Sequence, residues 1–430
     1  MNFKNKKTFF LPFLFILSVT AFSQGEKKLT LSIEDSVKYA TEGNLSAKEA
    51  EISLGSAKRA SSYSWNSFIP TIKASGTLSG TTDTDDPAIS IGASASLGLS
   101  PSIYTSIKAA KLSYQQEQIT YEQAVRTIEL NVRKAYNKLL YESEYLKLLE
   151  ANVSSAKLQY DTNQTRYNRG QLAKLDVVSA QVSYQNAKVN YENQEVTFAN
   201  DLDSFKQMLG INLDTEITLS GSLEGFLSLD SITENSIKDL DKKSADIETL
   251  EKKIEVGENS LLATRFSAWG PSLTGSISYQ KSGTVNTGID SDSGVTSYSV
   301  GLSIPLDGYI PWSSGALSIE NQKDNLKSLQ LQLEDAKTTY TMNVANYLKK
   351  IQSSQSALKL RQSSVELAKE SYQMSLEAYN RGTKDLLSLQ SALDSLTEAQ
   401  VNVMSEAYTL ASNILDLENT IGVPFGTIAR

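Results

Sequence analysis

The tetrapeptide Tyr-Asn-Arg-Gly occurs at Tyr167–Gly170 and again at Tyr379–Gly382. The two copies are offset by 212 residues, and the same offset relates residues 160–210 to residues 372–422 without a gap. A repeat of this length is far longer than the roughly 20–50 residues of a solenoid unit. We therefore interpret the chain as a duplicated half-molecule, in which each half forms a helical hairpin with this tetrapeptide at its tip.

Composition excludes several classes of function. The 430-residue chain has no cysteine and no histidine, which removes disulfides, zinc–thiolate sites and catalysis by either side chain. The formal net charge is −8, and no basic patch suited to nucleic acid is present. A phosphate-binding Gly-x-x-x-x-Gly-Lys-Ser/Thr motif is also absent. We expect no cofactor and no metal, and an enzyme is the poorest hypothesis because long heptad helices offer no pocket.

The N-terminus has the pattern of a secretory signal peptide over residues 1–23. Three lysines precede an apolar run from Phe9 to Phe22, and Ala21-Phe22-Ser23 provides a small-x-small cleavage site. An N-terminal membrane anchor is the alternative, but the run is shorter than the ~20 residues that a helical span needs. No later stretch is apolar enough for a membrane helix. The protein is therefore expected to be exported and to cross a membrane, if at all, with strands.

Helical periodicity covers most of the chain. A helix is expected from Leu31 to about Ser62, capped by Ser32 with Asp35 and continuing past Gly43. A second runs from Ile103 to about Arg166, and its apolar seam has the three–four spacing of a coiled coil. About 60 residues at 1.5 Å each give ~90 Å of helix, too long for a compact globule. Further helices are expected over residues 174–208, 232–265, 314–379 and 386–421.

Four segments instead alternate with period two. Apolar residues or glycines occupy most of one face, and polar residues or glycines, chiefly serine and threonine, occupy the other. Each is about ten residues long, as a tilted membrane strand requires. The expected strands cover residues 71–82, 90–100, 272–282 and 295–305.

Aromatic residues gather where these strands meet the helices. Trp65, Phe68, Trp269 and Trp312 all occupy such junctions. Aromatics at the ends of membrane strands form the interfacial girdle, which favours these four as membrane-interface residues. For any one of them an ordinary core aromatic at a domain corner is an equal alternative.

Four strands cannot close a membrane barrel, because an open sheet edge cannot face lipid. Three chains would supply twelve strands, more than the roughly eight of the smallest membrane barrels. The expected fold class is an α+β membrane protein, with helical hairpins forming an α-barrel and four strands per chain completing a trimeric transmembrane β-barrel. The expected divisions are residues 1–23 (signal peptide), 24–211 (first repeat), 212–231 (connecting segment), 232–423 (second repeat) and 424–430 (tail).

The chain resembles the TolC family of outer-membrane efflux and secretion channels over essentially all of its mature length. The specific resemblance lies in the tips, RYNRGQLAKLDVVSAQ at Arg166–Gln181 and AYNRGTKDLLSLQSALDS at Ala378–Ser395. The resemblance implies a homotrimer in the outer membrane whose helical tunnel extends into the periplasm. It also implies a periplasmic adaptor and an inner-membrane transporter as partners. A non-conducting, periplasm-spanning tether is the alternative function.

The resemblance also implies a gate at the periplasmic tips. Asp176, Tyr379 and Lys384 match a tyrosine–arginine–aspartate network of the family, with lysine in place of arginine, which loses the bidentate fork. Ser388 and Ser391 stand where the family's best-known member has an acidic ring, so ion selectivity there stays open.

Two further roles are expected at the tips. Asp385 is an acid that could replace the ring, although it could equally be a helix N-terminal charge. An adaptor is expected to dock on the exposed tip residues, although the glycines could serve only to end their helices. The expected adaptor contacts are Arg169, Gly170, Arg381 and Gly382.

Overall fold

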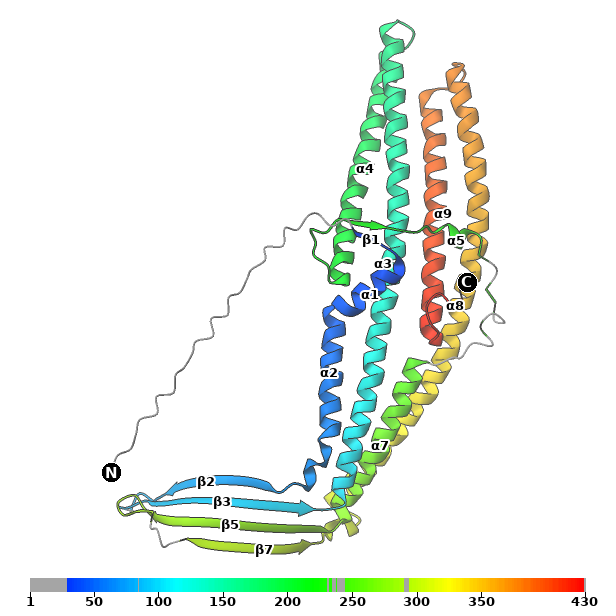
Figure 1. Cartoon of the computed structure of the whole chain (residues 1–430). Coiled ribbons are helices and arrows are strands. Elements are labelled where there is room, and N and C mark those ends of the chain that lie inside the picture. Colours follow the sequence, from blue (N-terminus) through cyan, green and yellow to red (C-terminus); the bar gives the residue numbers. More distant parts are fainter. Residues whose placement is uncertain are drawn as a thin grey trace.

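The computed structural model of the chain describes residues 29–83, 85–229, 232–233, 237, 244–289 and 294–428. The proposed signal peptide lies outside these residues. Long helices run side by side and end in two tips at one end of the molecule, and a sheet projects sideways from the other end (Figure 1). The C-terminus lies about midway between the two ends (Figure 1).

Two helical hairpins of matching size form the body of the molecule, as the repeat predicts. The first pairs α3 (Ser102–Asn168) with α4 (Lys174–Leu209), and the second pairs α8 (Ser314–Asn380) with α9 (Leu386–Ile421). The long helices each have 67 residues and the returning helices each have 36. At 1.5 Å per residue, the long helices extend about 100 Å. The equal helix lengths show that the sequence duplication is also a structural duplication.

Shorter elements flank the halves of α3 and α8 that lie nearest the sheet. Helices α1 (Ile33–Gly43), α2 (Leu45–Ser62) and α7 (Ala245–Trp269) pack along them. Strands β1 (Leu29–Leu31) and β4 (Ile217–Leu219) pair in parallel at mid-height, beside the short helix α5 (Glu224–Leu227). The 3₁₀ turns η1 (Ser64–Phe68) and η2 (Asp307–Tyr309) lie next to the sheet.

The single helix expected from Leu31 to about Ser62 is wrong, because the chain breaks at Asn44. The Asn44 backbone is extended, and its side-chain oxygen accepts from the Ser46 N–H at 2.9 Å, which caps α2. The Asn44 amide also donates to the carbonyl of Met208 at 3.0 Å. An asparagine that can cap the next helix competes with helix continuation, and here the contact with α4 decides the outcome. The predicted Ser32–Asp35 capping box is present.

The sheet at the end of the helices contains the four predicted strands. All neighbouring strands are antiparallel, in the order β2 (Thr71–Ser79), β3 (Ala88–Leu99), β5 (Ser272–Thr284) and β7 (Val295–Ser303). The short strand β6 (Gly288–Ile289) pairs with the last two residues of β5. The register aligns apolar residues on one face. A representative row is Ile72, Ala95, Ile277 and Tyr298.

Both outer strands of this sheet lack a second neighbour. Within the described residues, β2 pairs only with β3 and β7 pairs only with β5. The apolar face is also uncovered, since Ile72 is 79% exposed and Tyr298 is 85% exposed. A single chain therefore leaves both an apolar surface and two hydrogen-bonding edges unsatisfied.

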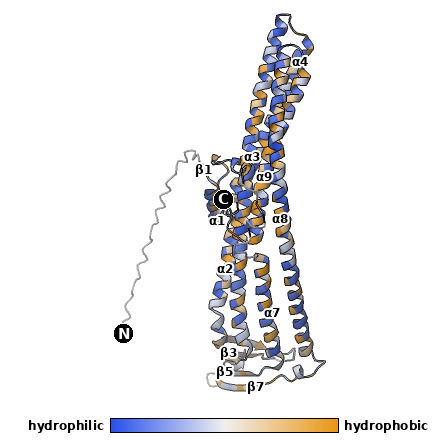
Figure 2. Ribbon diagram, turned by 90° about the vertical axis from the view of Figure 1, so that its right-hand side faces the viewer, coloured by the Kyte–Doolittle hydropathy of each residue, from blue (hydrophilic) through white to orange (hydrophobic). Residues whose placement is uncertain are grey.

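The main core lies where the two halves meet. Val132 on α3, Phe205 on α4 and Leu410 on α9 are among its fully buried members. The Tyr136 hydroxyl in this core donates to the carbonyl of Leu31 at 3.0 Å, which ties β1 to α3. Elsewhere polar and apolar residues intermix along the helices (Figure 2). None of the helices in the described ranges combines the length and apolarity needed to span a membrane.

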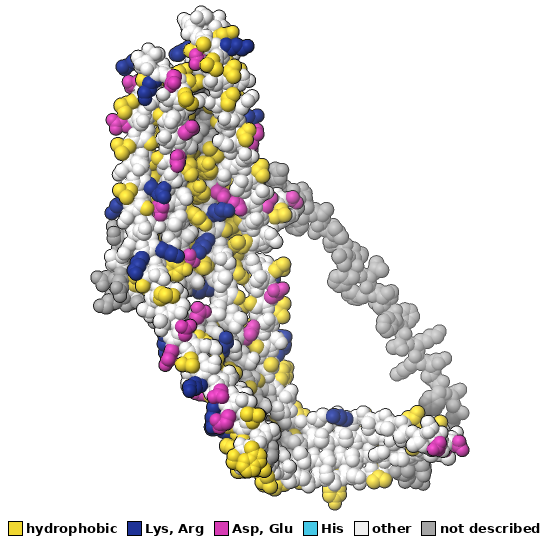
Figure 3. Space-filling model, turned by 180° about the vertical axis from the view of Figure 1, so that it is seen from behind, with side chains coloured by type: hydrophobic (Ala, Val, Ile, Leu, Met, Phe, Trp, Pro, Cys, Tyr) yellow, Lys and Arg dark blue, Asp and Glu magenta, His cyan; other side chains and the backbone are white. Residues whose placement is uncertain are grey.

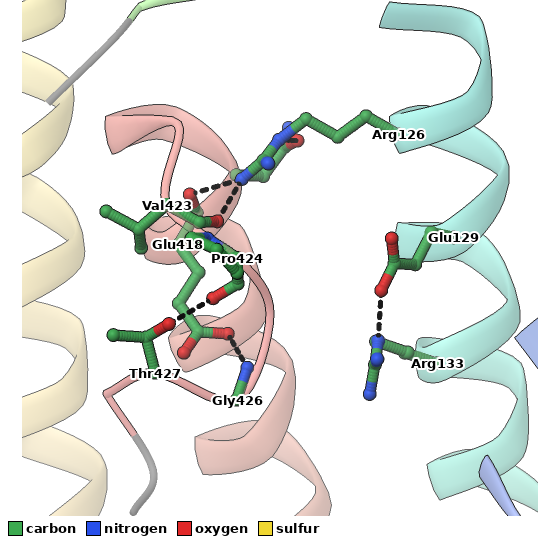
Figure 4. A network of polar contacts seen from close by, with 9 residues as sticks. Arg126, Glu129, Arg133, Glu418, Val423, Pro424, Gly426 and Thr427 are labelled. Atoms are coloured by element: carbon green, nitrogen blue, oxygen red, sulfur yellow. Dashed lines mark hydrogen bonds and ion pairs between the residues drawn. The ribbon is translucent and has the colours of Figure 1, made fainter. Parts of the chain in front are cut away.

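A turn after α9 closes this region (Figure 4). The Arg126 guanidinium of α3 donates to the carbonyls of Glu418 and Val423 at 2.7 and 2.6 Å, which caps the end of α9. The buried Glu418 carboxylate accepts from the N–H groups of Gly426 and Ile428 at 2.9 and 2.7 Å. The predicted tail at residues 424–430 is thus, as far as residue 428, part of the packed structure.

Candidate functional site: the helical tips

Each tip is shaped by its glycine. Gly170 and Gly382 both have φ of +72°, a left-handed conformation that strains any residue with a side chain. The chain then reverses. The Gln171 N–H donates to the backbone carbonyl of Arg166, and the Thr383 N–H donates to the backbone carbonyl of Ala378, each at 2.9 Å. These are the bonds of a helix C-terminal glycine motif. Gly170 and Gly382 therefore do end their helices, as the alternative interpretation expects.

Tyr379 joins the two hairpins below their tips. Its side chain is only 8% exposed, and its hydroxyl donates to the side-chain oxygen of Asn163 on α3 at 2.9 Å. Ala180 of α4 and Leu386 and Leu389 of α9 complete a small apolar cluster around the ring. Tyr379 therefore connects α8 to the first hairpin of the same chain.

Asn163 is a site residue that the sequence analysis missed. It is fully buried although it is polar. The seam residues Ala156 and Tyr160 are four apart, and a further step of three reaches position 163, so the residue occupies a seam position. A polar residue in a coiled-coil seam specifies register at a cost in stability, and this was the available signal. Its counterpart in the second half is Ser375, which is also buried.

The other proposed gate residues make local contacts in the single chain. Lys384 donates to the Ser375 hydroxyl at 3.3 Å. The Asp176 carbonyl lies 3.5 Å from the Asn163 amide, at the limit of a hydrogen bond. Within the described residues, no ion pair joins the Asp176 carboxylate to Lys384. The tyrosine–lysine–aspartate network is thus not assembled inside one chain, and the gate stays a prediction.

Asp385 is the N-cap of α9. Its carboxylate accepts from the Ser388 N–H at 2.9 Å. Hydrogen bonds from Ser388 hold the pKa of Asp385 below its usual value, so it is ionised at neutral pH. Asp385 therefore acts as a charge at the helix N-terminus, which is the alternative role expected for it. Ser388 takes part in this cap through its backbone N–H.

The proposed adaptor-contact residues are solvent-facing. A side chain added at Gly170 or Gly382 would meet nothing within 4 Å. Arg381 forms an ion pair with Glu377 at 3.2 Å, and both side chains are at least 70% exposed. Arg169 is exposed as well. The tips therefore present two open, cation-bearing turns.

A groove separates the two hairpins between the tips and the mid-height core. Its volume is about 520 Å³, and it is lined by amides, hydroxyls and apolar side chains from α3, α4, α8 and α9. The Gln390 amide donates to the Ser183 hydroxyl across it. Burial raises the pKa of Asp394 in its wall. The groove could not be predicted from local sequence patterns, because residues of both halves line it.

The four proposed interface aromatics lie at the junction of sheet and helices. Trp312 is 87% exposed, and Trp65 and Phe68 are more than half exposed. Trp269 is the most enclosed, since its indole N–H donates to the carbonyl of Gly308 at 2.8 Å and its ring stacks on Tyr309. The role of these four residues at a membrane interface stays a prediction.

Comparison with known proteins places this fold in a family of outer-membrane channels. The family model described as outer membrane efflux protein matches residues 38–211 and 237–423, one match for each half. The chain therefore belongs to the outer membrane efflux protein family, and it is an efflux channel protein of the outer membrane that extends into the periplasm.

Two curated relatives are both outer membrane protein TolC. The protein from Escherichia coli (strain K12) is 25% identical over 346 residues, covering 76% of this chain and 69% of its own length. The one from Salmonella enteritidis is 23% identical over 343 residues, with the same coverage.

Solved structures show the same fold at lower identity. The Campylobacter jejuni CmeC outer membrane channel has a TM-score of 0.72 at 17% identity and covers 91% of this chain and 85% of its own. The open state of the Neisseria gonorrhoeae MtrE outer membrane channel has a TM-score of 0.71 at 17% identity, with 91% and 89% covered.

Proposed function

We propose that three copies of this chain form a passive exit duct of a tripartite efflux or type I secretion system. The single observation that carries the proposal is the unfinished sheet. Its two outer strands have free edges in the described chain, and lipid does not tolerate such edges. Three copies would join β7 of one chain to β2 of the next, with the apolar faces toward lipid and the polar faces around a wet lumen.

The helices support the same assembly. They are arranged in the order α4, α3, α9, α8, since α3 packs against α4 and α9, and α9 packs against α8. The two outer helices carry exposed apolar residues seven apart, which we name the α4 stripe and the α8 stripe. The α4 stripe is Leu175, Val182, Val189 and Val196, and the α8 stripe is Leu360, Leu367 and Met374.

The α4 stripe faces away from its own hairpin. Val182 and Val189 lie roughly 120–180° around the helix from the buried Val177 and Ala180, at about 100° per residue. A seven-residue apolar repeat on one face is the pattern that packs against another helix. We propose that the α4 stripe of one copy packs against the α8 stripe of the next, which closes a ring of twelve helical segments (four from each chain).

Assembly must also reorient the sheet. In the single chain the sheet projects to one side of the helices (Figure 1). Prolines flank the strand–helix junctions at Pro70, Pro101 and Pro271. We propose that the strands turn upright at these junctions when neighbouring copies pair with their edges.

Opening of the duct is proposed to occur at the tips. The Tyr379–Asn163 bond holds the two hairpins of each chain together, and in the assembled ring Asp176, Lys384 and Asp385 face neighbouring copies and complete the closure. A periplasmic adaptor that engages Arg169, Gly170, Arg381 and Gly382 would separate the hairpins. Because the sequence has no nucleotide-binding motif, an inner-membrane transporter supplies the energy.

Planar-bilayer recording of the purified full chain tests the proposal. A closed-tip trimer is expected to give small, stable currents, and the variant Tyr379→Ala is expected to give larger ones. Cross-linking in detergent should yield trimers. The non-conducting tether predicts no current from either form, and a stable monomer that lacks both conductance and cross-linked species would overturn the duct.

A further inference from the structure

The polar face of the four-stranded sheet is almost free of charge. Among the residues of β2, β3, β5 and β7, only Lys73 and Lys281 are charged. Lys73 is on the polar face, in register with Ser94, Ser278 and Ser297 on the other three strands. Seen from behind, the surface of the sheet is mostly white, the colour of uncharged polar side chains and backbone (Figure 3).

Lys281 belongs to the opposite face. It follows Leu273, Ile277 and Tyr279 at even spacing along β5, and side chains two apart share a face of a strand. Its register partner on β3 is Ile91, another apolar-face residue. Only one of the two lysines is therefore placed to face a lumen.

The charge of Lys73 is not neutralised nearby. Its side chain is exposed and makes no ion pair or hydrogen bond in the described part of the chain. The described acids closest in sequence beyond β2 are Asp83 and its neighbours in the loop after Ser79, and Ser79 itself is about 20 Å along the strand at 3.3 Å per residue. That separation exceeds the screening length of about 10 Å in 0.1 M salt.

We infer that Lys73 determines charge selectivity in the β-domain of this channel, so that the barrel lumen favours anionic solutes such as carboxylates, phosphates and sulfates. The inference rests on the proposed trimer. Three copies place three ammonium groups at one level of a lumen whose strand walls bear no negative charge. A narrow passage with low-dielectric walls focuses such a field and concentrates counter-ions. The serines in register with Lys73 are uncharged, so they do not neutralise its ammonium group.

Reversal potentials in a KCl gradient test this inference. The variants are Lys73→Gln, Lys73→Glu and the charge-preserving Lys73→Arg, with Lys281→Gln as a matched control on the lipid-facing side. Each is recorded alone and combined with Tyr379→Ala, so that the tips do not limit the current. Lys73→Gln should lower the chloride-to-potassium permeability ratio about tenfold, the low end of what field focusing produces. Lys73→Glu should lower it further, and Lys73→Arg and Lys281→Gln should leave it unchanged.

Thiol labelling supplies an independent readout, because the sequence contains no cysteine. A cysteine introduced at Lys73 should react with a membrane-impermeant, charged methanethiosulfonate reagent, and one introduced at Lys281 should not. Labelling at position 73 with the negatively charged reagent should then shift selectivity toward cations.

The outcomes separate the two proposals. Absence of current in every form would overturn the duct and, with it, the role of Lys73. Normal currents whose selectivity is the same in wild type, Lys73→Gln and Lys73→Glu, in both backgrounds, would overturn the role of Lys73 and leave the duct standing. An equal shift from Lys281→Gln would also overturn it, since a lipid-facing residue cannot select ions.

Discussion

The hydroxyl of Tyr379 and the side-chain oxygen of Asn163 lie 2.9 Å apart, in a hydrogen bond that joins residues 216 positions apart in the sequence. Both residues are buried, and they belong to different hairpins of one chain. Tyr167 occupies the equivalent position in the first repeat, yet it is 40% exposed. Two identical tetrapeptides therefore have different roles, and only the second contributes a tyrosine to the contact between the hairpins.

The variant Tyr379→Phe should weaken the closed tips. It removes the shorter of two hydrogen bonds to the buried Asn163 oxygen, which also accepts from the Gln159 amide at 3.3 Å, and this loss costs about 1 kcal/mol in the closed state. Single-channel recordings should show a higher open probability or a larger conductance than the parent. Tyr167→Phe is the matched control because its hydroxyl is outside the contact, and an equal response from both variants would contradict the gate role of Tyr379.

Stability should depend on pH through Glu142. This α3 carboxylate is 3% exposed, and burial raises its pKa from 4.5 to about 7, although Lys138 lies 3.5 Å away. The folded-state pKa exceeds the unfolded value, so stability is greatest below about pH 4.5 for this group and falls as pH rises toward 7.

The variant Glu142→Gln should remove that fall. Above pH 7 its free energy of unfolding should exceed that of the parent by on the order of 2 kcal/mol, so it should unfold at a higher temperature. Near pH 4.5 the two should unfold at a similar temperature. Thermal unfolding followed by circular dichroism across this range measures the difference. Glu144→Gln, at an exposed pair with Lys147, should leave the profile unchanged. A Glu142→Gln profile parallel to that of the parent would refute the assignment.

Replacing Arg126 should loosen the end of α9. The guanidinium caps two carbonyls and lies 4.7 Å from the Phe425 ring centroid, so Arg126→Ala should destabilise the fold by roughly 2–3 kcal/mol. Arg126→Lys should rescue little, because a single ammonium group cannot replace both the Nη2 group that bonds the two carbonyls and the Nε–H that donates to the Asn419 side chain at 3.0 Å. Chemical denaturation measures both. Full rescue by lysine would show that charge alone matters.

Cross-linking tests how copies meet. The double variant Val189→Cys/Leu367→Cys places one thiol on the α4 stripe and one on the α8 stripe, with no other cysteine in the chain. A short bifunctional thiol reagent should produce dimers and trimers on denaturing gels. The double variant Val189→Cys/Leu158→Cys, which pairs the α4 stripe with an exposed apolar residue of α3, should not. If only the Val189→Cys/Leu158→Cys variant formed cross-linked oligomers, α4 of one copy would contact α3 of the next, and the proposed α4–α8 contact would be wrong.

Local periodicity in the sequence determined most of the secondary structure of this protein. The heptad seams, the alternation of the four strands and the glycine turns at the tips follow from short-range spacing, because the helix and strand periods depend on residues only a few positions apart. The same alternation placed Lys73 opposite to the apolar residues of β2, which the register then aligned with serines across the sheet. The family resemblance was likewise visible in the tip motifs alone.

Other features depended on contacts between distant segments. Asn44 breaks a helix because its amide reaches Met208, and the 212-residue repeat cannot reveal that Tyr379 is buried whereas Tyr167 is not. The Arg126 cap on the end of α9 and the groove between the hairpins likewise require both halves. Spacing along a chain specifies which side chains share a face, but burial and partners depend on what packs against that face, and only the tertiary structure supplies those neighbours.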